Sequence, residues 1–336
     1  MRKAVFGRDP QPEWGGGTHT RFVKPAVSRT PTIVAIGLLV VPLLVALAAL
    51  SGLPYQGVDI LAQFTAPALA GALIFAGLLA LLKLRTPFVL AFLVSSVLAV
   101  AVWPQWAPDR GNPRPNGPVL SIYSSNLRAE NEDTARIRTS IDRADPDVVV
   151  LIETSRTVID RIDTVLTGYP YRAVTFDRRR GTEGLVIASR YPLKREPFRP
   201  SDVNHALAFV DTPLGRVNVI AVHLDRPWPY RKESRQLNQL QALRPIIAPL
   251  RGPTILAGDF NSVSSARVGR QVQTTMGLKP NPGWPGTWPA RLPSLLGLTI
   301  DQLYRTDDLA VVSRDLGLRN GSDHRPLVTR LTLAAL

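Results

Sequence analysis

The chain has 336 residues, a formal net charge of +14 and no cysteine. The lack of cysteine excludes disulfide frameworks and thiolate metal sites, and the length is enough for about two domains. The charge indicates an anionic partner, such as nucleic acid, a phosphorylated small molecule or anionic lipid, although solubility alone also accounts for a basic surface. No feature of the sequence indicates an obligate protein partner.

Charge and hydrophobicity divide the chain into four parts. Residues 1–117 hold 10 Lys/Arg and 4 Asp/Glu, and residues 118–336 hold 30 and 22. Within the first part, the stretch 32–103 is almost free of charge. The predicted parts are a basic cytoplasmic N-terminal tail (1–30), a three-span transmembrane region (31–104), a linker rich in Pro and Gly (105–117) and a soluble domain (118–336).

Three apolar stretches are predicted as transmembrane helices, at 32–52, 58–82 and 87–103. A bilayer core takes about 20 apolar residues as helix, so the first two are long enough and the third is slightly short. Membrane helices tolerate prolines such as Pro42 and Pro67. A buried helical core is the alternative, but three nearly uncharged runs in succession favour membrane spans.

The loop charges predict how these spans are oriented. Residues 1–30 carry six Lys/Arg, the loop at 53–57 carries none, and the loop at 83–86 carries Lys83 and Arg85. The positive-inside rule then places the N-terminus in the cytoplasm and everything after Trp106 outside. The predicted location is therefore the cell membrane, with several spans and an external soluble domain. A cleavable signal peptide is the competing interpretation of the first span, but it leaves the other two unexplained.

The soluble half alternates strands and helices, which is typical of an α/β fold. Helices are predicted at 135–144, 157–166 and 231–247. Strands are predicted at 119–126, 145–153, 184–193, 254–261, 299–306, 309–315 and 325–333, with a hairpin at 205–224.

Several apolar strands in this half have polar residues at one end. These residues are Asn126, Glu153, His223, Asp259, Asn261, Asp323 and His324. Each alone has a plain explanation as a helix cap, a structural histidine or a turn residue. Together they predict a crevice, because neighbouring strand ends line one edge of a sheet and ligands bind there.

The chemistry of these side chains predicts a phosphoesterase. Glu153 and Asp323 offer hard oxygen ligands suited to Mg²⁺ or Mn²⁺, and zinc is disfavoured without a cysteine cluster or a histidine pair at zinc spacing. The two histidines suit acid–base work near neutral pH. Asn126 and Asn261 are neutral donors for phosphate oxygens. A metal, histidines and amides around an anion are typical of phosphate ester hydrolysis.

These residues resemble the endonuclease/exonuclease/phosphatase superfamily, the DNase I-like phosphoesterases. The matching motifs are SSNL (124–127), PDVVVLIE (146–153), VHL (222–224), GDFN (258–261), ID (300–301) and SDHRP (322–326). The resemblance covers roughly 118–336, and the chain departs from the common pattern at Ile152, where Gln is usual. It implies a four-layered α/β sandwich, preceded here by the three predicted transmembrane helices.

The resemblance also implies roles for the site residues. Glu153 is the expected main metal ligand, with Asn126 and Asp323 beside the metal. His324 is the expected general base, oriented by Asp301, and His223 stabilises the phosphoryl oxygens or protonates the leaving group. Asp259 and Asn261 orient the nucleophile and the phosphate.

The substrate is less well defined by the sequence. RPWPYR (226–231) and the segment 281–298 place aromatic and arginine side chains near the expected crevice: Trp228, Tyr230, Trp284 and Trp288. Such residues suit base stacking in a nuclease or the headgroup layer of a lipid phosphoesterase. The expected partners are thus the lipid bilayer and an anionic substrate, either a lipid-linked phosphate or a nucleic acid.

Membrane anchoring favours an envelope substrate, because it raises the effective concentration of membrane-borne molecules. In layout the chain is similar to membrane-anchored members of the superfamily linked to resistance against teicoplanin-type glycopeptides, for which a lipid-linked phosphate is the suspected substrate. A surface nuclease and a non-catalytic phosphate-binding module remain the alternatives.

Overall fold

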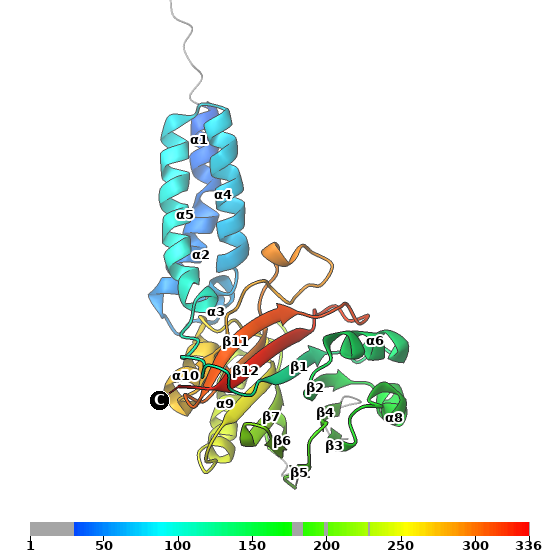
Figure 1. The fold of residues 1–336 in the computed structure, drawn as a ribbon. Helices are drawn as coiled ribbons and strands as arrows, with labels where there is room; N and C mark the ends of the chain where they lie inside the picture. The colour runs from blue at the N-terminus through cyan, green and yellow to red at the C-terminus, as the bar shows by residue number, and fades with distance from the viewer. Residues whose placement is uncertain (1–29, 177–183, 198–200, 228, 336) are drawn as a thin grey trace, which may run out of the picture.

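The computed structural model describes residues 30–176, 184–197, 201–227 and 229–335. An upright bundle of helices stands on one end of a two-sheet sandwich, and the short helix α3 lies where the two meet (Figure 1). The predicted cytoplasmic tail, except for Thr30, and the predicted rim residue Trp228 lie outside the described residues.

The helices of the bundle begin and end near prolines. They are α1 (Thr30–Leu38), α2 (Val40–Ser51), α3 (Gln56–Ala62), α4 (Thr65–Leu81) and α5 (Arg85–Trp106). Proline has no N–H to donate to the carbonyl four residues earlier, and its ring crowds that carbonyl. The breaks at Leu39 and at Gln63–Phe64 accordingly fall just before Pro42 and Pro67.

Two helical stretches, Thr30–Ser51 and Arg85–Trp106, are long and apolar enough by composition to cross a membrane. The predicted second span is not one straight helix. It consists of α3 and α4, which satisfy the same criterion only together and are bent by 57° at their junction. The physical reason is Pro67, which the sequence analysis treated only as a tolerated residue. Three spans therefore stay a prediction.

The soluble half contains two six-stranded sheets. The first has the order β11-β12-β1-β2-β4-β3 and the second β5-β6-β7-β8-β10-β9. Their bounds are β1 (Leu120–Asn126), β2 (Val148–Thr154), β3 (Tyr171–Phe176), β4 (Gly184–Ser189), β5 (Leu193–Arg195), β6 (Asn204–Thr212), β7 (Gly215–His223), β8 (Thr254–Asp259), β9 (Lys279–Pro280), β10 (Asp301–Arg305), β11 (Leu309–Leu316) and β12 (Leu327–Leu333).

The sheets form the inner layers of a sandwich, and helices form the outer layers. These helices are α6 (Thr134–Ala144), α7 (Arg156–Asp160), α8 (Ile162–Val165), α9 (Glu233–Ile247) and α10 (Arg267–Met276), whereas the 3₁₀ turn η1 (Ser294–Leu296) contacts α4 of the bundle. α6, α7 and α8 pack on the outer face of the first sheet, whereas α9 and α10 pack on that of the second. This confirms the predicted α/β sandwich.

Alternation along the central strands explains the layering. In β1, Leu120 and Ile122 face the core between the sheets, while Tyr123 faces the helix layer. In β8, Ile255 faces the inner core and Leu256 packs under the helices. Successive side chains of a strand point to opposite faces. A central strand of a four-layered sandwich is therefore apolar on both faces and reads as a continuous apolar run.

One predicted strand is in fact two. The segment 184–193 was expected to form a single strand, but β4 belongs to the first sheet and β5 to the second. Between them, the Tyr191 N–H donates to the Ser189 hydroxyl (2.9 Å) and the Arg190 N–H donates to the Asp147 carbonyl (3.1 Å). With Pro192 following, this turn carries the chain from one sheet to the other.

The bundle is packed against the sandwich. The Gly283 N–H donates to the Gln105 carbonyl at 2.7 Å, and the rings of Trp106 and Trp284 lie 6.3 Å apart. A Cβ on Gly283 would lie 2.6 Å from the Gln105 side chain, so only glycine allows this approach. The last turn of α5 is therefore fixed to the loop before η1.

The stretch predicted as a linker also contacts the sandwich. Arg305 donates to the Asp109 carbonyl at 2.8 Å, and the Val311 N–H donates to the Arg110 carbonyl at 2.7 Å. Lys279 forms an ion pair with the Asp109 carboxylate at 2.7 Å. These contacts attach residues 109–110 to the ends of β9, β10 and β11.

Candidate active site

The polar strand ends predicted from the sequence meet at one edge of the sandwich. β1 and β2 are parallel neighbours in the first sheet, and β7 and β8 are parallel neighbours in the second. In the second sheet, His223 is the register partner of Asp259, and Asp259 is that of Asp301 on antiparallel β10. The topology thus carries these side chains to a shared edge.

Asn126 joins the two sheets at this edge. Its Nδ2 donates to Glu153 Oε1 at 2.8 Å within the first sheet and to Asp259 Oδ2 at 2.9 Å across to the second. Its Oδ1 accepts from the Arg128 N–H at 2.8 Å. In this arrangement Asn126 holds two buried carboxylates in place, while its roles toward phosphate and metal stay predictions.

The two histidines approach the carboxylates from different sides. His223 Nε2 lies 3.2 Å from Glu153 Oε1 and 4.0 Å from Asp259 Oδ2. His324 Nε2 lies 3.9 Å from the same Asp259 oxygen, and its Nδ1 lies 2.9 Å from Asp301 Oδ2. Asp259 is therefore central, and His324 contacts Asp301, the residue expected from the resemblance to orient it; that role stays a prediction.

Burial and charge shift the pKa values of two of these groups. Burial raises the pKa of Asp259 to about 6, with the Asp301 carboxylate acting in the same direction and the histidines against it. Burial by itself would lower the pKa of His324, but Asp301, helped by Asp259 and Asp323, raises it to about 10. The site thus concentrates negative charge that a cation would neutralise.

The backbone at these strand ends is locally strained. Glu153 and Asn261 have φ values of 50° and 47°, which are uncommon for residues with a side chain. A Cβ on Gly258 would lie 1.8 Å from the Val222 carbonyl oxygen, so this position requires glycine. The close approach of β7 and β8 here sets Asp259 beside His223. Asn261 is fixed by Nδ2, which donates to the Leu224 carbonyl at 2.9 Å.

Asp323 is placed differently from the other predicted metal ligands. Its Oδ2 accepts from Trp288 Nε1 at 3.3 Å, and its backbone carbonyl accepts from the Ala290 N–H at 2.6 Å. Among the described residues, two groups have ligand atoms within 4.8 Å of one another: Glu153, His223 and Asp259, and Asp259, Asp301 and His324. Asp323 belongs to neither group, and its metal contact stays a prediction.

The first of these groups fits a divalent ion. Glu153 and Asp259 are 5% and 1% exposed, their ligand oxygens lie within 4.8 Å of each other, and Asp301 is equally close to Asp259. Burying charged carboxylates is costly unless opposite charge compensates them. Carboxylate oxygens are the ligands that Mg²⁺ and Mn²⁺ prefer, whereas imidazole suits softer metals, so His223 is not needed as a ligand. The residues present therefore suit a divalent metal centred on Glu153 and Asp259.

A cavity of about 310 Å³ opens beside His324. Its wall combines the polar residues Asn261, Asp323 and His324 with an apolar set: Ile60, Phe64, Pro227, Pro229, Tyr230, Trp288, Leu298 and Ile300. Gln63 and Arg226 complete it. Of the described aromatic residues predicted near the crevice, Tyr230 and Trp288 line this cavity, whereas Trp284 packs on Trp106 instead.

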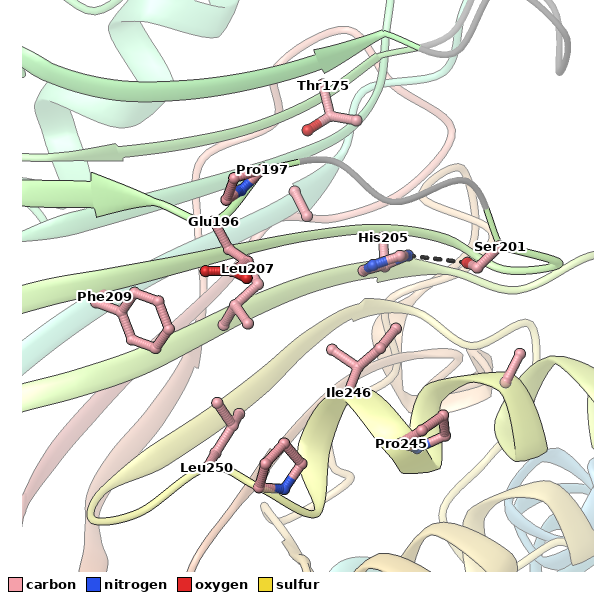
Figure 2. Close-up of a pocket in the computed structure, with 13 residues that line it drawn as sticks. Thr175, Glu196, Pro197, Ser201, His205, Leu207, Phe209, Pro245, Ile246 and Leu250 are labelled. Carbon is pink, nitrogen blue, oxygen red and sulfur yellow. Dashed lines mark hydrogen bonds between the residues drawn. The ribbon is translucent and has the colours of Figure 1, made fainter.

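Another cavity, of about 420 Å³, lies between β6 and α9 (Figure 2). Apolar side chains such as Leu207, Ile246 and Leu250 point into it, and His205 Nδ1 lies 3.2 Å from the Ser201 hydroxyl. None of its described lining residues is one of the strand-end residues. The volume of a cavity therefore does not identify the candidate active site. The convergence of ionisable side chains identifies it.

The contribution of the helical region to the cavity was not predicted from the sequence. Ile60, Gln63 and Phe64 come from α3 and from its bend into α4. A signal was present, because Asp59 and Gln63 are polar residues inside an otherwise apolar run and Pro67 follows them. The whole stretch 58–82 was instead predicted as one transmembrane helix.

Comparison with known proteins agrees with this geometry. A model of the Endonuclease/Exonuclease/phosphatase family matches residues 122–324. The fold is similar to the endonuclease/exonuclease/phosphatase of Beutenbergia cavernae DSM 12333 (TM-score 0.51, 23% identity, 65% of this chain and 72% of that one). It is also similar to the one from Bacteroides vulgatus (TM-score 0.53, 17% identity, 64% and 99%).

A further similar structure is that of ANGEL2, a 2′,3′-cyclic phosphatase, in complex with adenosine-2′,3′-vanadate (TM-score 0.50, 17% identity, 66% and 97%). No curated protein matches the chain. The family match spans more than half of the 336 residues and ends at His324, so it contains every predicted site residue. The chain therefore belongs to the endonuclease/exonuclease/phosphatase family, whose members are phosphoester hydrolases.

Proposed function

We propose that the protein is a membrane-anchored phosphoesterase that uses Mg²⁺ or Mn²⁺ and hydrolyses a lipid-linked phosphate or pyrophosphate outside the cytoplasm. One observation carries the proposal: the cavity at His324 is walled by both the catalytic sandwich and the helical region. A substrate in that cavity touches His324 at one end and apolar side chains of α3 at the other. This arrangement suits a molecule with a phosphate head and a hydrocarbon chain.

The hydrolytic step needs a base on one side of phosphorus and an acid on the other. Asp301 accepts the Nδ1–H of His324, which leaves Nε2 to take a proton from the attacking water. Attack forms one P–O bond and breaks the P–O bond to the leaving oxygen. We assign the protonation of the leaving oxygen to His223, whose Nε2 lies 4.0 Å from Asp259 Oδ2.

His324 must be neutral to act as a base, although the surrounding carboxylates raise its pKa to about 10. Glu153 and Asp259 would hold a divalent cation, whose positive charge would offset these carboxylates and stabilise charge on the phosphoryl oxygens. Asn126 keeps both carboxylates oriented toward that position. Arg226, beside the Tyr230 ring, adds a positive side chain to the cavity wall for an anionic head group.

The apolar share of the wall supports a lipid over a nucleic acid. Trp288, Leu298 and Ile300 lie next to the catalytic His324, and Ile60 and Phe64 extend this apolar surface into the helical region. Many of the bundle's larger side chains are exposed, among them Ile74 (71%) and Leu81 (81%). Exposed apolar surface of this extent is expected to contact lipid.

The preference for a lipid substrate over nucleic acid is tested with the purified full chain in lipid nanodiscs, with Mg²⁺ in the buffer. We expect phosphate release from a long-chain polyprenyl pyrophosphate and little nicking of supercoiled plasmid DNA under the same conditions. Efficient nicking without phosphate release would instead identify a surface nuclease. The absence of both activities in a protein that binds Mg²⁺ would contradict a catalytic role on these substrates.

The external location rests on the charge at the far end of the bundle. Lys83 lies between α4 and α5, and Arg85 is the first residue of α5, which returns over 22 residues to Trp106 at the sandwich. Since positively charged loops stay in the cytoplasm, the sandwich is expected on the opposite side. The three predicted spans give the same result.

Reporter fusions test this orientation in bacterial cells. Alkaline phosphatase, which is active only outside the cytoplasm, is expected to be active when fused after Leu336 and inactive when fused after Lys83. Green fluorescent protein at the same two positions is expected to give the reverse pattern. Fluorescence from the Leu336 fusion, with inactive phosphatase there, would contradict the external site.

A further inference from the structure

The α3–α4 elbow, defined as Ile60, Gln63 and Phe64, brings the helical region into the catalytic cavity. Pro67 bends the chain there by 57°, so α3 lies across the end of the sandwich. α3 also contacts the sandwich, because Gln56 Nε2 donates to the Arg231 carbonyl at 3.3 Å. The elbow is therefore part of the cavity wall.

A groove of about 350 Å³ begins next to the elbow and lies between α4 and the break separating α1 from α2. The Ala68 N–H donates to the Phe64 carbonyl at 2.9 Å, so Phe64 and Ala68 are one helical turn apart on the same face. Ala68 lines the groove, while Phe64 lines the catalytic cavity. Further along this face, Gly71, Ala72 and Phe75 form the groove wall.

We propose that the elbow and this groove bind the hydrocarbon chain of the lipid substrate, so that the helical region is part of the substrate site as well as an anchor. The inference rests on the proposed function, because it states where the chain lies while the phosphate is at His324. A cavity of about 310 Å³ is at the small end of the range for ligand sites, so it holds the head group and the first segment of a chain. The rest of a long chain continues into the adjoining apolar groove.

The groove can be filled without disturbing the protein. An added Cβ at Gly71 meets no atom within 4 Å, and the same is true at Gly77 on the same helix. Gly71 lines the groove, whereas Gly77 does not. Because both glycines are in α4 and leucine is the better helix former, Gly71→Leu and Gly77→Leu form a matched pair that is expected to fold.

The test compares a long-chain polyprenyl pyrophosphate with geranyl pyrophosphate, using the full chain in nanodiscs. We expect Gly71→Leu to lower the ratio of kcat/KM values, long over short, by about tenfold or more, since the lost apolar contact acts on the long chain alone. Gly77→Leu is expected to keep the wild-type ratio. The inference would be overturned if Gly71→Leu left the ratio unchanged, or if the two variants changed it equally. The groove would then be covered by bilayer lipid or by a second copy of the chain.

A second measurement reports binding without turnover. The chain has no cysteine, so Phe64→Cys in a His324→Ala background gives a single thiol at the elbow. With Mg²⁺ and the long-chain pyrophosphate at ten times its Kd, maleimide labelling is expected to slow about tenfold. Inorganic pyrophosphate should protect much less. The control is Leu61→Cys, whose residue is 39% exposed and does not line the cavity, and its labelling should stay unchanged.

The two proposals fail in different ways. If the wild-type protein hydrolyses neither prenyl pyrophosphate, the proposed function is wrong and this inference falls with it. If the wild-type protein hydrolyses both, but the thiol of the Phe64→Cys variant is not protected and the ratio in Gly71→Leu does not change, the phosphoesterase assignment stands and only the chain-binding role of the elbow is rejected.

Discussion

Replacement of His324 by alanine is expected to lower kcat by about two to four orders of magnitude, which is the usual contribution of a general acid or base. His324 is the histidine whose Nδ1 contacts Asp301 at 2.9 Å and whose side chain lines the cavity. Without it, the attacking water has no acceptor for its proton. The measurement is the rate of phosphate release at saturating substrate and Mg²⁺.

His205→Ala is the control for this variant, because it removes another buried histidine that lies in the cavity between β6 and α9. It is expected to keep most of the wild-type kcat, provided that circular dichroism shows a folded protein. Asp301→Asn should move the acidic limb of the pH profile of kcat/KM to lower pH, because Asp301 raises the pKa of His324. A His324→Ala variant with wild-type kcat would contradict its role as the base.

Glu153→Gln is expected to weaken Mg²⁺ binding by more than about a hundredfold, since loss of a partner that merely supports a metal ligand already costs 10–100-fold. Glu153 is 5% exposed, accepts from Asn126 and lies 3.2 Å from His223, so glutamine keeps the shape but removes the charge. Isothermal titration calorimetry with Mg²⁺ and Mn²⁺ measures the loss directly.

Asp142→Asn provides the matched control for the charge change. Asp142 is 61% exposed and forms an ion pair with Arg138 on the surface of α6. Its neutralisation should leave the affinity for Mg²⁺ unchanged. In the wild-type protein, EDTA should abolish activity, and Mg²⁺ or Mn²⁺ should restore it. Full activity of Glu153→Gln after EDTA treatment would contradict the metal assignment.

The convergence of the polar strand ends could be predicted from the sequence because the information for it is local. A buried strand is a run of apolar residues, and the polar residue at its end is visible in the run itself, as with Asp259 after ILAG. The convergence of Asn126 and Asp259 from different sheets then follows from parallel strand pairs ending at one edge. Helix α6 could also be predicted, because Ile137 and Ile141 are four residues apart, which is a helical spacing.

The features that were missed depend on contacts between distant segments. Trp288 donates a hydrogen bond to Asp323, which is 35 residues later in the chain. No sequence pattern near either residue predicts this bond. The chain leaves the first sheet after Ser189 and joins the second at Leu193, which the apolar run 184–193 conceals. Pro67 was visible, but its consequence was not, because a proline in an apolar run is compatible with a straight span, a kink or a re-entrant turn.

The packing of Trp106 on Trp284 and of Gln105 on Gly283 has a consequence for which substrates can react. A domain on a loose tether samples many heights above a bilayer, whereas this one is seated directly on its helices. If the helices cross a bilayer as proposed, the distance from the lipid surface to His324 would be nearly constant. A phosphate carried at that depth would react, and one held further out on a large sugar or peptide head group would not reach the base. The packing of the domain on its helices would thereby select lipid substrates by the distance between the phosphate and the membrane surface.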